Sequence, residues 1–168
     1  VPTPNELSEV DEQTLTELKA YPAVISSSIE RYRFREALGE LMNVARLGNK
    51  YLADEEPWKV IKTDPARVQT QMYVALQIAA ALSSLCEPFL PFTSAKLSRI
   101  LKIEDKIDWK TVADNSYLIP AGHQIGEAEL LFAKIEDEEI QKQIDKLEAT
   151  KTANKAENKK AEPQKDLI

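Results

Sequence analysis

Four kinds of residue in this chain could carry chemistry: one cysteine, one histidine, a short acidic run and two tryptophans. Because His123 is the only histidine, a metal site built on two histidines is impossible, and its loop position after Gly122 predicts a surface or capping role. Cys86 lies on an apolar stripe without a local histidine to activate it, which predicts a buried thiol. The consecutive acids at 54–56 cannot all converge on one ion, so they indicate a solvated helix end. None of these residues forms a catalytic set.

Trp58 stands in an unusually polar setting. It follows Pro57 and the acidic run, and it precedes Lys59 and Lys62. An aromatic ring presented beside lysines suits stacking on a nucleic-acid base, which is worth roughly 1–3 kcal/mol. The residues alone leave a second interpretation open, in which Trp58 packs beneath the end of a helical bundle.

The composition favours an all-α protein, because glycine is scarce (4 residues) and strong helix formers dominate. The formal net charge of −6 argues against a general nucleic-acid coat, which needs a large positive field. Any contact with RNA must therefore be local. A single cysteine excludes an internal disulfide, and no apolar run is long enough to span a membrane.

Apolar residues at spacings of three and four predict four helices, which occupy about 11–32, 34–52, 65–86 and 91–101. Pro22 is expected to kink the first helix or to split it. The first three have about 20 residues each, and with short connections the helices should form an antiparallel up-and-down bundle.

The later sequence changes character. Residues 103–125 show no clear period, and Trp109 has apolar neighbours there that predict a packing anchor. Residues 129–136 read as an extended apolar segment, and 135–149 as one more helix. Beyond Thr150 the sequence is poor in apolar residues, which is typical of a linker or a marginal exposed helix.

We therefore expect three parts: a linker at 1–10, a helical bundle with a C-terminal extension at 11–148, and a charged tail at 149–168. The chain opens with Val-Pro-Thr-Pro, which we take as the sign of a piece of a longer protein.

Three stretches in order resemble methionyl-tRNA synthetases. NKYLADEEPW (49–58) is similar to the family's Asn-x-Tyr and Pro-Trp motif, and CEPFLPFTSAKLSRIL (86–101) to its Pro-Phe-x-Pro-Phe segment. GHQIGEAELLFAKIEDEEI (122–140) is similar to a later segment of the same enzymes. Related class I synthetases more often carry His-Ile-x-Glu-Glu where this chain has TSAKLS (93–98), so the methionine enzyme is the better match.

The resemblance implies an anticodon-binding helical bundle. It assigns to Trp58 the stacking contact with an anticodon base of tRNA(Met), and it places Asn49 at the border of the same loop. Lys59, Lys62 and Lys134 are further candidates for contact with RNA or with another domain. The family's hydrogen-bonding readers belong to an upstream helix, and residues 1–30 contain no counterpart.

The resemblance further implies a parent methionine–tRNA ligase whose catalytic domain uses ATP and holds zinc. This chain contains neither the nucleotide-binding motifs nor the zinc cysteines, so we expect no catalytic site and no cofactor in it. The expected partners are the tRNA(Met) anticodon loop and the parent's catalytic domain, in the cytoplasm, without membrane or DNA. The alternative is a free-standing helical protein-interaction domain, which a buried Trp58 would favour.

Overall fold

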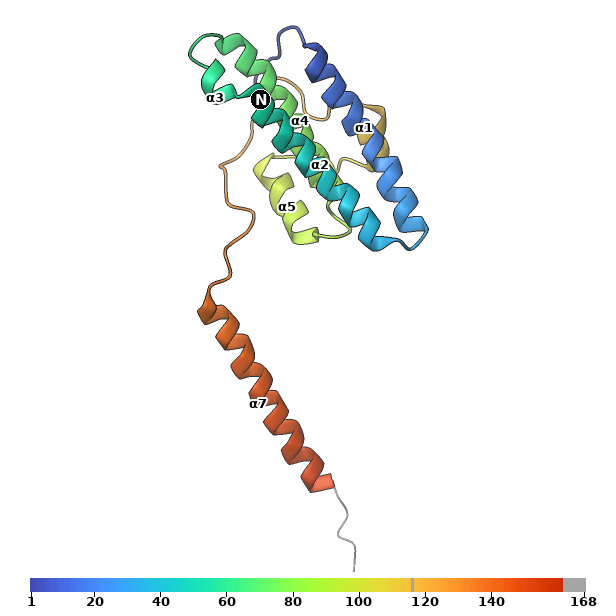
Figure 1. Cartoon of the computed structure of the whole chain (residues 1–168), viewed down its shortest axis with the longest axis vertical. Coiled ribbons are helices and arrows are strands. Elements are labelled where there is room, and N and C mark those ends of the chain that lie inside the picture. The colour runs from blue at the N-terminus through green and yellow to red at the C-terminus, as the bar shows by residue number, and fades with distance from the viewer. Residues whose placement is uncertain (116, 162–168) are drawn as a thin grey trace, which may run out of the picture. The chain divides into compact units, whose positions relative to one another are not determined.

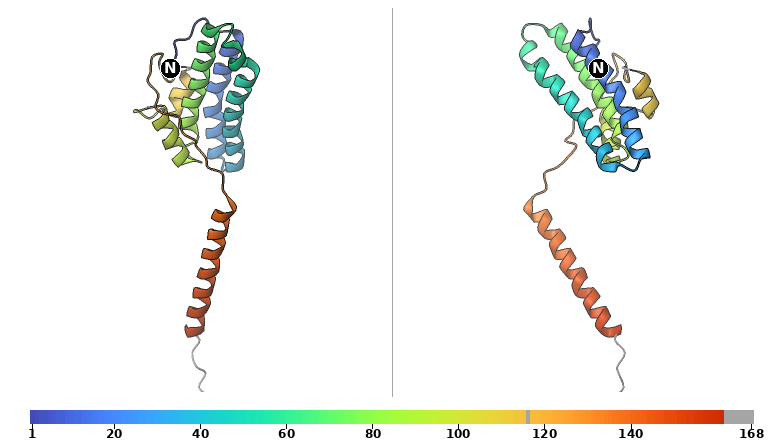
Figure 2. Two further views of the ribbon diagram at one scale, coloured as in Figure 1. Left: turned by 90° about the vertical axis from the view of Figure 1, so that its left-hand side faces the viewer. Right: turned by 45° about the vertical axis from the view of Figure 1, so that its right-hand side comes forward.

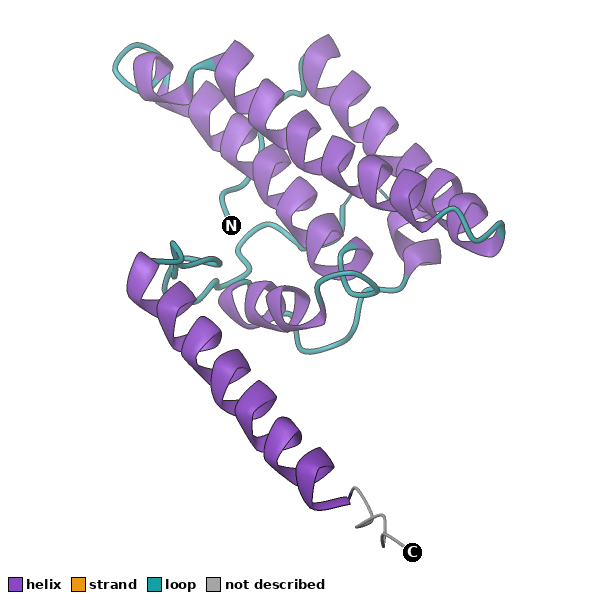
Figure 3. Cartoon of the chain, turned by 60° about the horizontal axis from the view of Figure 1, so that its bottom comes forward, coloured by secondary structure: helices purple, strands orange, loops and turns teal. Residues whose placement is uncertain are grey.

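The computed structural model describes residues 1–115 and 117–161 (Figure 1). The chain divides into two compact units, Val1–Leu131 and Phe132–Ile168, which are described separately. The described residues form helices without a strand (Figure 3). The helices are α1 (Glu9–Glu30), α2 (Phe34–Glu55), α3 (Pro57–Val60), α4 (Pro65–Leu85), α5 (Pro91–Ile100), α6 (Trp109–Asp114) and α7 (Asp137–Ala161).

Three long helices form the frame of the first unit. α1, α2 and α4 lie side by side, and each runs antiparallel to the one before it (Figures 1 and 2). α5 packs against α4, and α6 packs mainly against α1. The predicted all-α antiparallel bundle is confirmed, and α5, with 10 residues, spans nearly the whole of the predicted range 91–101.

Local signals in the sequence set the helix ends. Ser8 and Asp11 form a capping box at the start of α1, in which each side chain accepts a hydrogen bond from the other's backbone N–H. Asp64 caps α4 by accepting from the Arg67 N–H at 2.9 Å, and Pro65 occupies the first helical position, where its missing N–H costs no helical hydrogen bond.

Pro22 does not split α1, so the expected split at this residue is wrong, whereas the expected kink stays a prediction. The helix runs without interruption from Glu9 to Glu30 with the proline buried inside it. Leu18 and Ile25, on either side of Pro22, are at most 1% exposed in the core. Packing on both sides of the proline therefore outweighs the lost backbone hydrogen bond, a cost of about 3 kcal/mol.

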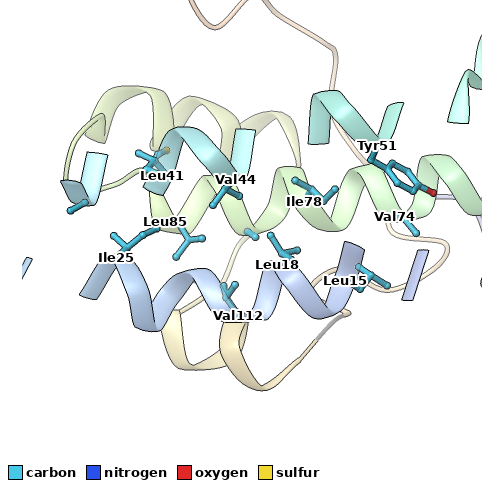
Figure 4. Packing of buried hydrophobic residues seen from close by; sticks show 13 residues of the cluster. Leu15, Leu18, Ile25, Leu41, Val44, Tyr51, Val74, Ile78, Leu85 and Val112 are labelled. Carbon is cyan, nitrogen blue, oxygen red and sulfur yellow. The ribbon is translucent and has the colours of Figure 1, made fainter. Parts of the chain in front are cut away.

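The apolar core extends along the three long helices (Figure 4). Leu15, Tyr51 and Val74 lie toward the end where α2 leads through α3 into α4, which we call the Trp58 end. Ile25, Leu41 and Leu85 lie toward the opposite end, where α1 turns into α2, which we call the Tyr32 end. The two ends are thus separated by the length of the bundle.

Side chains of α4 hold the irregular segment that follows α5. The amide of buried Gln77 donates to the Ile119 carbonyl at 2.9 Å and accepts from the Leu118 N–H at 2.6 Å. Ser84 donates to the Ile107 carbonyl at 2.6 Å. The short helix α6, which the sequence pattern did not predict, is fixed within this segment by its N-cap Asp108.

Residues 1–10, expected as a linker, run along the bundle in this structure. The Asn5 backbone N–H donates to Thr70 Oγ1, and its side-chain amide donates to the Ala66 carbonyl, both at 2.9 Å. Leu7 packs against the core. The predicted linker, bundle and tail boundaries at residues 10 and 148 stay predictions for the parent protein.

The second unit contains α7. This helix begins two residues later than predicted and continues to Ala161, well past the predicted end at 149. Residues 137–154 are exposed, which agrees with a solvent-exposed helix beyond Thr150. Its alanine, lysine and glutamate content supplies enough helix propensity for this extension.

Candidate nucleic-acid interface at the Trp58 end

Trp58 lies on α3, the single helical turn that joins α2 to α4 (Figure 1). Pro57 is buried, whereas Trp58 is 58% exposed. Glu56, the C-cap of α2, adopts a left-handed conformation (φ 43°), and the following proline disfavours continuation of the right-handed helix through it. This conformation ends α2 and redirects the chain, so that the proline faces the bundle while the indole remains accessible.

The acidic run beside Trp58 is neutralised residue by residue. Asp54 pairs with Lys50 at 2.8 Å, Glu55 with Arg67 at 2.6 Å, and Glu56 with Lys59 at 2.7 Å. These pairings reduce the repulsion that three adjacent carboxylates would exert on a polyanion.

The two lysines beside Trp58 differ in their availability. Lys59 is partly occupied by its ion pair with Glu56. Lys62 is exposed and has no ion pair within residues 1–115 and 117–161. Lys62 is therefore the better placed of the two for a phosphate.

A buried polar network lies at the base of this turn. Arg67 on α4 makes a two-pronged ion pair with Asp11 on α1, in which Nη2 donates to Oδ1 at 2.9 Å. The same guanidinium donates to Glu55 Oε2 at 2.6 Å. Tyr51 donates to Asp11 at 2.6 Å, and the Gln71 amide donates to the Glu55 carbonyl at 3.1 Å. The network thereby joins α1, α2 and α4 immediately before the turn that carries Trp58.

The network changes the proton affinities of its members. Burial raises the pKa of Asp11, but hydrogen bonds from Arg67 and Tyr51 outweigh it and hold this pKa below its ordinary value. The Asp11 carboxylate therefore contributes stability above its unfolded pKa, and this stability is lost as the pH falls through the lowered folded value. Burial and the hydrogen bond to Asp11 raise the pKa of Tyr51, and hydrogen bonds to Asp11 and Glu55 raise that of Arg67.

The other predicted site residues lie at different places. Asn49 is exposed on α2, six residues before its end, which corresponds to about 9 Å along the helix axis. Lys134 belongs to the second unit and pairs with Glu136 at 3.1 Å. The RNA contacts assigned to Trp58, Asn49, Lys59, Lys62 and Lys134 stay predictions.

The non-catalytic interpretations of three residues agree with the structure. Cys86 is a free, buried thiol whose pKa is raised by burial. The His123 ring is 2.6 Å from the carbonyl of Leu101 at the end of α5, a capping contact. Trp109 packs against the core, and its Nε1 donates to the Ser84 carbonyl at 3.3 Å.

Sequence reasoning did not find the Arg67 network. Asp11 was recognised only as a helix start and Glu55 only as part of an acidic run. Tyr51 and Asp11 are 40 positions apart in the sequence, and Arg67 and Asp11 are 56 positions apart. No local spacing connects them, so only the antiparallel arrangement of the helices reveals the contact.

Comparison with known proteins decides the family. A protein-family profile described as "Anticodon binding domain of methionyl tRNA ligase" matches residues 1–152. The chain belongs to this family. It is 81% identical over 168 residues to the methionine–tRNA ligase of Flavobacterium psychrophilum, covering all of this chain and 24% of the relative. It is 71% identical over 194 residues to that of Flavobacterium johnsoniae, covering all of this chain and 27% of the relative.

Solved structures agree on the fold. The apo form of Mycobacterium tuberculosis methionyl-tRNA synthetase matches with a TM-score of 0.74 at 20% sequence identity, over 81% of this chain and 28% of that protein. The same enzyme in complex with methionyl-adenylate matches with a TM-score of 0.72.

The chain spans about a quarter of the length of the curated relatives that it matches. Among the described residues, no helix combines the length and the apolar character needed to cross a membrane.

Proposed function

We propose that this chain recognises the anticodon loop of tRNA(Met) as part of a methionine–tRNA ligase, with the Trp58 indole stacking on an anticodon base. The observation that carries the proposal is the 58% exposure of Trp58 on a turn whose backbone is held by buried neighbours. An indole left in solvent at a fixed turn offers a face to an unstacked base, which is how proteins read single-stranded RNA loops. A free-standing protein-interaction domain is disfavoured by this exposure.

Stacking of the Trp58 indole on a base requires little electrostatic attraction between this chain and the RNA. The paired acids leave Lys62 as an exposed cation on the turn, where it meets a phosphate of the loop. Asn49 borders the same loop from α2 and adds a side-chain amide that both donates and accepts hydrogen bonds. Lys59 becomes available when RNA displaces Glu56, and Lys134 contributes from the second unit or contacts another domain.

The parent protein charges tRNA(Met) with methionine in an ATP-dependent reaction in the cytoplasm. ATP and zinc belong to its catalytic domain, which is the second partner of this chain. Within residues 1–115 and 117–161, no three histidine, cysteine, aspartate or glutamate side chains gather as a metal site would require. The contribution of this chain to the reaction is to bind and orient the RNA.

The test compares Trp58→Ala with Ile61→Ala, a matched change of another exposed apolar residue (46%) on the same turn. An RNA stem-loop with a CAU anticodon is titrated onto each variant of the isolated chain. Trp58→Ala should weaken binding by about one base stack, roughly 1–3 kcal/mol, while Ile61→Ala leaves it nearly unchanged. In the parent, Trp58→Ala should impair tRNA charging and spare methionine activation. Equal affinity of wild type and Trp58→Ala would contradict the proposal.

A further inference from the structure

A polar groove runs between α1 and α2 and reaches the Trp58 end of the bundle. The two helices lie side by side (Figure 1), and the cavity between them has a volume of about 450 Å³. On α2 its lining extends from Asn43 to Asp54, which corresponds to about 16 Å along the helix axis. This volume lies within the range of small-molecule sites. The groove is therefore large enough to take one nucleoside of an RNA loop.

The carboxylates of the groove already accept hydrogen bonds from neighbouring side chains. Glu17 on α1 accepts a hydrogen bond from the Tyr21 hydroxyl at 3.0 Å. Burial and this hydrogen bond raise the pKa of Tyr21 to about 12, so the hydroxyl keeps its proton at neutral pH. On α2, Asp54 pairs with Lys50 at 2.8 Å. Each acid is thus engaged with a donor of its own helix.

Arg46 on α2 supplies donors to the groove. Its Nη1 donates to Asn43 Oδ1 at 2.7 Å, and it has no carboxylate partner among the side chains described, those of residues 1–115 and 117–154. A guanidinium carries several N–H groups, so most of them remain available to a ligand. The Asn43 amide in turn donates to Glu40 at 3.1 Å. These hydrogen bonds along α2 help to fix the position of the guanidinium at the groove.

The available groups favour a base that presents carbonyl oxygens. The N–H groups of Arg46 require acceptors, while Leu47 and Tyr51 offer apolar area to the flat face of a base. A phosphate would also accept from the arginine, but the carboxylates of Glu17 and Asp54 line the same groove and repel it. Among the bases of a CAU anticodon, uracil is the one that presents a carbonyl oxygen on either side of its ring N–H.

The groove lies close enough to Trp58 for both to contact one RNA loop. Asp54 lines the groove and lies four residues before Trp58 in the sequence. Bases of a single-stranded loop can be unstacked and splayed out, so neighbouring bases can occupy separate sites on a protein. A loop that places one base on the Trp58 indole can therefore place another base in the groove.

We propose that the groove between α1 and α2 binds the uracil of the CAU anticodon and that Arg46 donates to its carbonyl oxygens. This inference rests on the proposed function, in which Trp58 stacks on an anticodon base. Stacking tolerates any base, whereas hydrogen bonds to a base edge distinguish one base from another. Arg46 is thus a specificity-determining residue, and Trp58 supplies affinity.

The preference of this chain for uracil tests the inference. Stem-loops with CAU and CAC anticodons are titrated onto each variant, because cytosine carries an amino group where uracil has a carbonyl oxygen. Wild type should bind CAU roughly tenfold more tightly than CAC, and Arg46→Met should bring the two affinities to within about twofold. Arg46 is exposed, so Arg46→Met should melt as wild type does. Arg35→Met, which changes another exposed arginine of α2 at the Tyr32 end, is the matched control and should keep the full preference.

The ratio of the two affinities separates this inference from the proposed function. Equal affinity of wild type for CAU and CAC overturns the inference. An Arg46→Met chain that keeps the preference also overturns it, and weaker binding of both stem-loops by that chain would assign Arg46 to a phosphate. Trp58→Ala reports on the proposed function alone, because it should weaken both stem-loops equally and preserve their ratio.

The full-length ligase gives a second readout of the same preference. The ratio of kcat/KM for charging tRNA(Met) with a CAU or a CAC anticodon should fall several-fold in Arg46→Met, while methionine activation without tRNA stays unchanged. An unchanged ratio overturns the inference.

Discussion

The two tryptophans occupy similar local structures but opposite environments. Each lies in the first turn of a short helix that interrupts a connection, Trp58 on α3 and Trp109 on α6. Trp109 packs on the apolar core and donates its N–H to the Ser84 carbonyl. Trp58 remains 58% exposed. The local helix therefore does not decide whether the indole is buried or exposed. The residues that lie beneath the short helix decide it.

Beneath α6 the bundle offers apolar side chains and the Ser84 carbonyl near the end of α4, which suit an indole. Beside α3 the space is filled by Pro57 and by the charged network of Arg67, Asp11 and Glu55. Buried charges cannot exchange their ionic partners for an aromatic ring without a large cost. The network thus supports the end of the bundle from which the turn projects.

The largest effect should follow from Arg67→Met, which removes the base of the Trp58 turn. Asp11 is 0% exposed, so the change leaves a buried carboxylate without its cation. Breaking such a pair typically costs about 3–5 kcal/mol, and we expect a loss of this size in the free energy of unfolding. Chemical denaturation measures it. Lys50→Met, which breaks an exposed pair with Asp54, serves as the control and should leave the transition almost where it was.

The second largest effect on stability is expected from Trp109→Ala. The half-buried indole and its hydrogen bond to Ser84 disappear, which should lower the free energy of unfolding by about 3 kcal/mol. Denaturation of Trp109→Ala beside Trp58→Ala sharpens the comparison, because the exposed ring should cost less than about 1 kcal/mol. If Trp58→Ala proves the more destabilising change, the two tryptophans have been assigned the wrong roles.

Truncation after Ala149 should have the smallest effect on the stability of the bundle. The residues removed belong to the second unit, and those described up to 154 are exposed. The melting temperature of the bundle in the truncated chain should agree with that of the full chain within a few degrees. A collapse of the shortened protein would show that its tail contributes to the core.

The periodicity of apolar residues in the sequence was sufficient to predict the positions of the long helices α1, α2 and α4. The spacing of these residues predicted the ranges of the three helices to within a few residues. The split expected at Pro22 was wrong because helix propensity alone does not account for the packing of the residues on either side of the proline. The helix α6 was missed, although Asp108 before Trp109 is a usable N-cap signal.

The candidate site was less predictable. The types of residue around Trp58 left both stacking and packing open; the family resemblance favoured stacking, and the exposure of the ring agrees with it. The salt bridge between Asp11 and Arg67 spans 56 positions, so it depends on how α1 and α4 align rather than on any motif. The pairing of Glu55 was likewise beyond the sequence, because its cation, Arg67, comes from another helix.

The central claim is that Trp58 stacks on an anticodon base, and its own fluorescence tests this most directly. In a Trp109→Phe background the emission comes from Trp58 alone, because the chain has two tryptophans. During titration with a CAU stem-loop that carries a separate fluorescent label, the account predicts quenching of Trp58 in step with the rise in RNA anisotropy. RNA binding without any change in Trp58 emission would contradict it.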